Sequence, residues 1–210
     1  MALGNAKRAR KRTPKIRVGK LEAAVRQLDT AIEFWFSEGD IVSVHTLASA
    51  AHEVIHSLHQ NRYPPGLSPD LLLDSLVIRD QGSRDWVRLL RAPQNFFKHA
   101  DKDPDPAGSI EFSPRTSELF ILTGIRGLGN LGVALSTPQS AFLAWFALNR
   151  PSYLTPKGRK TYLSGVTEAK RAQIVSLPRP DFLRVFRLAR ERMKLSCERC
   201  PGVGHGGLSR

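Results

Sequence analysis

The sequence predicts an all-α protein, a helical bundle of about five to seven helices. Apolar residues recur at three- and four-residue spacing over most of residues 19–150, and residues that favour helix starts precede several of these runs. Only residues 110–112 resemble a strand, as one short extended segment. A hydrophobic fraction of 41% in 210 residues is sufficient to build a core.

The first two helices are predicted over residues 19–37 and from Asp40 to about Gln60. Ser37 to Gly39 interrupts the apolar pattern, and the Asp40 carboxylate suits the N-cap of the second helix. Because so few residues connect them, the two helices are expected to pair antiparallel.

Later helices are predicted from the same signals. Ser68 and Pro69 suit a helix start, and Pro93 is expected to bend or restart a helix that begins near Asp85. The other predicted segments are a helix over 116–135, a helix over 137–148 that is apolar on nearly every side, irregular or short helical structure over 151–178, and an amphipathic helix over 180–194.

Charge divides the chain into a mildly acidic middle and two basic ends. The net charge is +8 over residues 1–20, −4 over residues 21–156 and +9 over residues 157–210, which gives +13 in total. We therefore predict a disordered basic arm over 1–18, a bundle core over 19–150, a basic C-terminal extension over 151–195 and a flexible tail over 196–210.

Composition argues against several classes of protein. The longest apolar run, residues 141–148, is far shorter than the roughly 20 residues of a membrane span. The basic start is not followed by the apolar segment of a signal peptide. Two cysteines, both near the C-terminus, make no disulfide framework. A cytoplasmic protein with no membrane contact and no cofactor is expected.

The basic ends suit contact with the phosphates of RNA or another nucleic acid. The predicted last helix carries basic residues on one face and apolar residues on the other, so we expect its apolar side to dock and its cationic stripe to face outward. A merely solvated face is the alternative. The candidate nucleic-acid-binding residues are Lys7, Arg8, Arg10, Lys11, Arg12, Arg184, Arg187, Arg190 and Lys194.

A His-Glu-x-x-His motif spans His52, Glu53 and His56. On a helix it places two imidazoles one turn apart beside a carboxylate, as in zinc hydrolases. No downstream segment supplies an obvious third ligand. His45, His52, His56 and His59 fall within about 60° around the helix axis, which favours a structural or partner-facing histidine seam beside the core.

Cys197 and Cys200, with His205, supply three zinc-type ligands in the tail, whereas a closed structural zinc site needs four. A second chain or a borrowed side chain would have to complete the site. An unstructured tail with two exposed thiols is the favoured interpretation, so no resident metal is predicted.

A polar stripe precedes the Asp-rich loop at residues 101–108. Arg91, Asn95 and His99 follow one another at four-residue spacing, which places them on one helix face. A cation, an amide and a titratable imidazole together suit a phosphate-rich ligand. The structural alternative is that Asn95 pins a helix end and His99 closes it, since a cationic histidine is favourable there.

Around residues 91–105 the chain resembles the HEPN superfamily of small helical bundles, and a group of uncharacterised bacterial helical proteins with an Asn-Phe-Phe-Lys-His-Ala-Asp segment. Asn95 and His99 match the Asn and His of the HEPN motif. Gln94 stands where that motif has Arg, and Arg91 is the nearest substitute.

The resemblance implies a metal-independent ribonuclease or a non-catalytic relative, typically a homodimer. It implies that His99 serves as general acid and base, that Arg91 or Lys98 stabilises the charge on the phosphate, and that Asn95 orients the phosphate or His99. A non-enzymatic module that binds a protein partner through amphipathic faces remains open, as does the zinc hydrolase.

Overall fold

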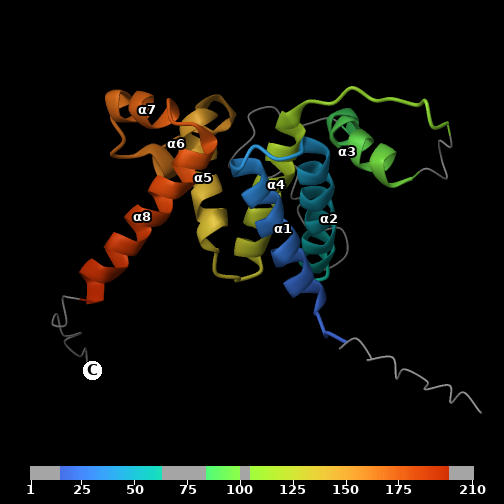
Figure 1. The fold of residues 1–210 in the computed structure, drawn as a ribbon, viewed down its shortest axis with the longest axis horizontal. Coiled ribbons are helices and arrows are strands. Elements are labelled where there is room, and N and C mark those ends of the chain that lie inside the picture. Colours follow the sequence, from blue (N-terminus) through green and yellow to red (C-terminus); the bar gives the residue numbers. More distant parts are fainter. Residues whose placement is uncertain (1–14, 63–83, 100–104, 199–210) are drawn as a thin grey trace, which may run out of the picture.

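The structure, a computed structural model, describes residues 15–62, 84–99 and 105–198. Within these ranges the protein consists of helices and connecting loops, which confirms the all-α prediction (Figure 1). The helices are α1 (Lys20–Phe36), α2 (Ile41–Gln60), α3 (Arg84–Lys98), α4 (Pro114–Asn130), α5 (Thr137–Asn149), the 3₁₀ helix η2 (Pro151–Tyr153), α6 (Pro156–Leu163), α7 (Glu168–Val175) and α8 (Arg179–Glu198).

Helices α1 and α2 form the predicted antiparallel pair. Asp40 caps α2, because its Oδ2 accepts hydrogen bonds from the backbone N–H of Ser43 at 2.8 Å and from the Ser43 hydroxyl at 2.7 Å. In the short connection Glu38 adopts a φ of 59°, in the left-handed region. This tight reversal lets the two helices lie against each other along their length (Figure 1).

Helix α4 completes the centre of the bundle by packing on α2 and α1. A Cβ at Gly124 would lie 3.3 Å from Cδ1 of Leu28, so the small residue allows the two backbones to approach closely. The helix is shorter than predicted at its C-terminal end, because Gly132 turns the chain with a φ of 78°. At its start the Ser113 hydroxyl caps it, and the helix begins at Pro114, two residues earlier than expected.

Helix α5 brings aromatic side chains into the core, as its apolar sequence predicts. The ring centroids of Trp35 and Trp145 lie 5.6 Å apart in an edge-to-face arrangement, and those of Phe36 and Phe142 lie 6.4 Å apart. At the start of α5, Asp29 accepts hydrogen bonds at 2.8 Å from both Ser136 and Gln139. These bonds fix the start of α5 to the middle of α1.

Helix α3 packs beside α2 and includes Pro93 in its interior. The predicted helix start at Ser68 and Pro69 lies outside the described residues. Residues 110–112 form no strand, and the ring of Phe112 packs 5.3 Å from His45 and 5.2 Å from Phe97. This segment therefore covers the region where α2 and α3 meet.

The C-terminal part begins with the short elements η2, α6 and α7, and ends with α8. Phe182 and Leu183 are buried, whereas Figure 1 shows the C-terminal end of α8 extending away from the bundle. None of the described helices combines the length and apolar content needed to cross a bilayer.

Candidate functional site

A pocket of about 550 Å³ lies where the start of α1, the second half of α2 and helix α3 meet. We call it the first pocket. Its charged and titratable lining residues come from all three helices: Lys20 from α1, His52, Glu53 and His56 from α2, and Arg91 from α3. Ser57 and Asn61 add polar groups on α2.

The predicted histidine seam lies inside the core. His45, His52 and His59 are almost completely buried. Phenylalanine rings surround the first two, since Phe120 lies 5.4 Å from the ring of His45 and 5.3 Å from that of His52. The His45 Nδ1 lies 3.1 Å from the hydroxyl of Ser117 on α4. The position beside the core was therefore wrong, because α4 closes over this face of α2.

Burial sets the charge of these histidines. Removal from water lowers the pKa of His45 to about 4. Burial, together with the neighbouring charges of His56 and Arg91, lowers the pKa of His52 to about 3. Both imidazoles are therefore neutral at pH 7, and the cationic Arg91 is close enough to His52 to disfavour a second positive charge there.

The side of α3 that carries Arg91 and Lys98 meets α2. The Lys98 Nζ forms an ion pair with Oε2 of Glu53 at 2.7 Å, and Gln94, one turn from each, is only 3% exposed. Asn95 lies on the exposed side of α3, and neither Asn95 nor His99 lines the first pocket. Of the stripe Arg91, Asn95 and His99, the rotation of α3 therefore turns only Arg91 into the first pocket, and a shared site for the three stays a prediction.

The described residues contain no group of three or more His, Cys, Asp or Glu side chains placed to hold a metal ion. The rings of His52 and His56 stack nearly parallel, with centroids 5.6 Å apart and an interplanar angle of 14°. Cys197 belongs to the last turn of α8, where side chains are outside the described set, and Cys200 and His205 lie beyond the described residues. The described residues therefore supply no third ligand to the His52–His56 zinc hypothesis, and the hypothesis at Cys197, Cys200 and His205 lies outside them.

The predicted stripe of α8 faces outward only in part, since Arg184 and Arg187 are exposed and Arg190 is half-buried. Arg187 pairs with Glu33 of α1, and Arg190 donates a hydrogen bond to the Ser140 hydroxyl of α5 at 3.0 Å. Arg184 stays exposed and pairs within the helix with Asp181. The exposed residues of α8 also include three apolar side chains, Val185, Leu188 and Met193.

The physical reason lies in the first two turns of α8. Phe182 stacks on Phe36 with centroids 5.9 Å apart, and Phe186 stacks on Phe182 at 6.3 Å. This aromatic contact selects the docked face, and helical spacing then carries Arg187 and Arg190 toward the bundle. Lys194 lies in α8 where side chains are outside the described set.

Sequence reasoning missed Lys20 as a site residue, although it ends the basic run that begins at Lys7. Residues 15–18 are exposed and lead directly into α1, so the basic arm joins the fold at the edge of the first pocket. The other arm residues, Lys7, Arg8, Arg10, Lys11 and Arg12, lie outside the described residues.

Comparison of the chain with protein-family models, with curated proteins and with solved structures finds no match.

Proposed function

We propose that the protein binds single-stranded RNA, with one phosphate in the first pocket and the neighbouring phosphates on the basic arm. The observation that carries this proposal is that Lys20 and Arg91 line the same pocket, at the point where the arm joins α1. Lysine and arginine are the usual partners of nucleic-acid phosphates.

The charges around the first pocket favour an anion. Glu53 is the one carboxylate among its described lining residues, and its ion pair with Lys98 offsets its charge. Lys20 and Arg91 therefore leave an excess of positive charge. Ser57 and Asn61 can donate further hydrogen bonds to phosphate oxygens.

The proposal covers binding and not cleavage. A general acid and base must reach the reacting oxygens, and His99 does not line the pocket that holds Arg91. His52 lines it, but with a pKa of about 3 it is neutral and weakly basic at pH 7. The ribonuclease activity implied by the HEPN resemblance would therefore need a different arrangement of α3.

The test is fluorescence polarisation of the full-length protein with a labelled oligouridine at several salt concentrations. We expect affinity to fall steeply between about 50 and 200 mM salt, since bound counterions are released. Arg91→Ala should weaken binding about tenfold and reduce the salt slope by about one. Removal of residues 1–14 should reduce the slope further, by several units.

Arg26→Ala is the matched control. Arg26 is an exposed arginine on α1 that pairs with Glu22 and does not line the first pocket. If Arg91→Ala and Arg26→Ala bind the oligouridine equally well, the first pocket is not the phosphate site. If wild-type affinity does not depend on salt, the proposal of phosphate binding fails altogether, and a protein-interaction module becomes the better interpretation.

A further inference from the structure

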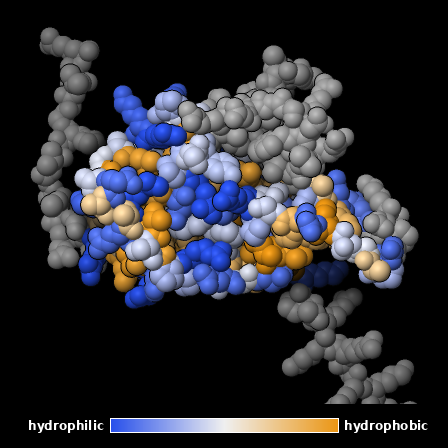
Figure 2. All heavy atoms as spheres, turned by 90° about the horizontal axis from the view of Figure 1, so that it is seen from above, coloured by the Kyte–Doolittle hydropathy of each residue, from blue (hydrophilic) through white to orange (hydrophobic). Residues whose placement is uncertain are grey.

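A second pocket, of about 390 Å³, lies at the opposite end of the α1–α2 pair. It opens beside the connection between these helices, where the start of α4, the end of α5 and the start of α8 also converge. Three arginines line it, Arg115, Arg150 and Arg179, together with two tryptophans, Trp35 and Trp145. Figure 2 looks onto this end of the molecule and shows hydrophilic residues across the middle of the face, between apolar patches.

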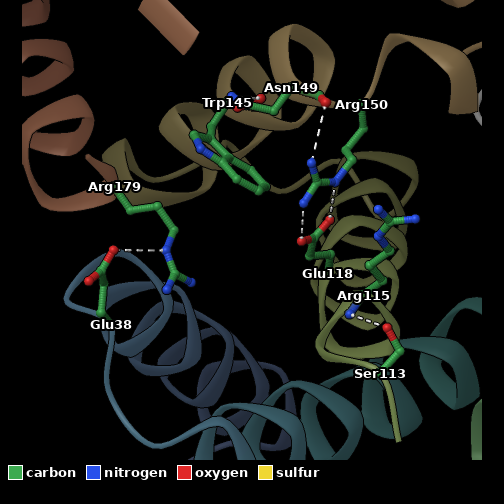
Figure 3. Close-up of polar contacts among 8 residues, drawn as sticks. All are labelled: Glu38, Ser113, Arg115, Glu118, Trp145, Asn149, Arg150 and Arg179. Atoms are coloured by element: carbon green, nitrogen blue, oxygen red, sulfur yellow. Dashed lines mark hydrogen bonds and ion pairs between the residues drawn. The ribbon is translucent and has the colours of Figure 1, made fainter. Parts of the chain in front are cut away.

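One arginine of the second pocket is held rigidly. Arg150 donates from Nε and Nη2 to the two carboxylate oxygens of Glu118, each at 2.9 Å (Figure 3). Glu118 is only 2% exposed, and the hydrogen bonds to it raise the pKa of Arg150 above its ordinary value. Because both oxygens of the Glu118 carboxylate bind the Arg150 guanidinium, Glu118 offsets the charge of Arg150 and not that of the other two arginines.

The second arginine is also held in place while most of its donors stay available. The Arg179 guanidinium lies 4.3 Å from the centre of the Trp35 ring, and its Nε donates to Glu38 at 3.4 Å. In Figure 3 this guanidinium points toward the space between α1 and α5. Stacking on the indole fixes its plane without using the Nη donors.

The third arginine has its guanidinium available for a ligand. Arg115 is exposed at the first turn of α4, and its side chain makes no ion pair with any described residue. Arg115 also lies at the N-terminus of α4, a helix of 17 residues whose dipole places partial positive charge there. The indole Nε1 of Trp35, which is 95% buried in the pocket wall, has no hydrogen-bond partner among the described residues.

We infer that the second pocket binds a small organic oxyanion, a carboxylate or phosphate group carried on a compact apolar body. Arg115 supplies the charge that no described carboxylate offsets, Arg179 adds its Nη donors although its Nε pairs with Glu38, and Arg150 positions the wall between them. Ile41 and the edges of Trp35 and Trp145 offer an apolar floor for the body of the ligand. This inference is independent of the proposed RNA binding, since the two pockets share no lining residue.

Tryptophan fluorescence of the full-length protein tests this inference directly, because two of its three tryptophans line the second pocket. The probes are benzoate, phenyl phosphate and inorganic phosphate. We expect a saturable change with benzoate or phenyl phosphate, at least about tenfold tighter than with inorganic phosphate, since the latter lacks an apolar body. Tighter binding of benzoate would identify the oxyanion as a carboxylate, and tighter binding of phenyl phosphate would identify it as a phosphate.

The decisive variant is Arg115→Ala, which removes an exposed side chain without breaking an ion pair among the described residues. It should weaken binding of the organic probe about tenfold or more, the usual result of losing a hydrogen bond to a charged group. Arg26→Ala should leave the affinity unchanged. The inference is overturned if no saturable fluorescence change occurs, or if inorganic phosphate binds as tightly as the organic probes. It is also overturned if the fluorescence change survives Arg115→Ala and is lost in Arg91→Ala.

Discussion

The two pockets lie at opposite ends of the same helix pair, and they differ in how they hold charge. The wall of the first pocket includes His52, which burial keeps neutral at pH 7, and the ion pair between Lys98 and Glu53 beside it is partly exposed. The second pocket contains arginines, one of them fixed by the buried carboxylate of Glu118. The two walls therefore rest on different chemistry, a buried neutral imidazole in the first pocket and a buried carboxylate paired with arginine in the second.

Acid should produce the largest effect, through the buried histidines His45 and His52 of α2, of which His52 lines the first pocket. The folded-state pKa values of His45 and His52 are about 4 and about 3, below the ordinary value of 6.5. The unfolded chain therefore binds protons between pH 6.5 and these values while the folded protein does not, so stability is fully present above pH 6.5 and is lost as pH falls. Two such groups predict a loss of about 4 kcal/mol between pH 7 and pH 5.

Urea unfolding at the two pH values measures this loss. The variant His52→Gln cannot titrate, so its difference between pH 7 and pH 5 should be about 2 kcal/mol smaller than that of the wild type. Its stability at pH 7 is itself expected to fall, which does not affect the comparison. If His52→Gln loses as much free energy of unfolding between pH 7 and pH 5 as the wild type does, the fold does not hold His52 neutral.

The second largest effect is expected at the second pocket. Glu118→Gln keeps the size of the side chain but removes the charge that faces Arg150 in a nearly buried position. Because Arg150 is itself 27% exposed and can regain water, we expect a loss of about 2 kcal/mol in the free energy of unfolding. Urea unfolding at pH 7 measures it, and a loss below about 0.5 kcal/mol would show that this pair does not fix the pocket.

Sequence patterns predicted the helices well, because the signals are local. The N-cap at Asp40, the short connection after α1 and the apolar α5 each depend on neighbouring residues, and each is confirmed. The rotation of a helix about its own axis is different. Both faces of α8 contain apolar residues, and its docked face is selected by Phe36, far away in the sequence.

The candidate sites show the same limit more sharply. Arg91 was singled out from its spacing, yet its partners in the first pocket come from α1 and α2 rather than from its own stripe. The arginines of the second pocket stand at the ends of three different helices and belong to no motif. Tertiary packing brings them together, so neither periodicity nor charge patterning could have found them.

The smallest expected effect on stability compares the two ion pairs directly. Glu53→Gln removes the carboxylate that pairs with Lys98, as Glu118→Gln does for Arg150, but Glu53 is 58% exposed. An exposed pair contributes little, so we expect a loss below about 1 kcal/mol in urea unfolding at pH 7. If Glu53→Gln loses as much free energy of unfolding as Glu118→Gln does, the ion pairs of the two pockets do not differ in their contribution to stability.

The same variant should tighten RNA binding at the first pocket. Removing the negative charge of Glu53 frees Lys98 and leaves Lys20 and Arg91 unopposed, so affinity for oligouridine should rise about two- to fivefold at low salt. The gain should shrink as salt is added, because these charges are partly exposed and are screened. Weaker binding by Glu53→Gln would show instead that Glu53 itself contacts the ligand, as a hydrogen-bond acceptor for a base or a sugar hydroxyl. The first pocket would then not be the phosphate site.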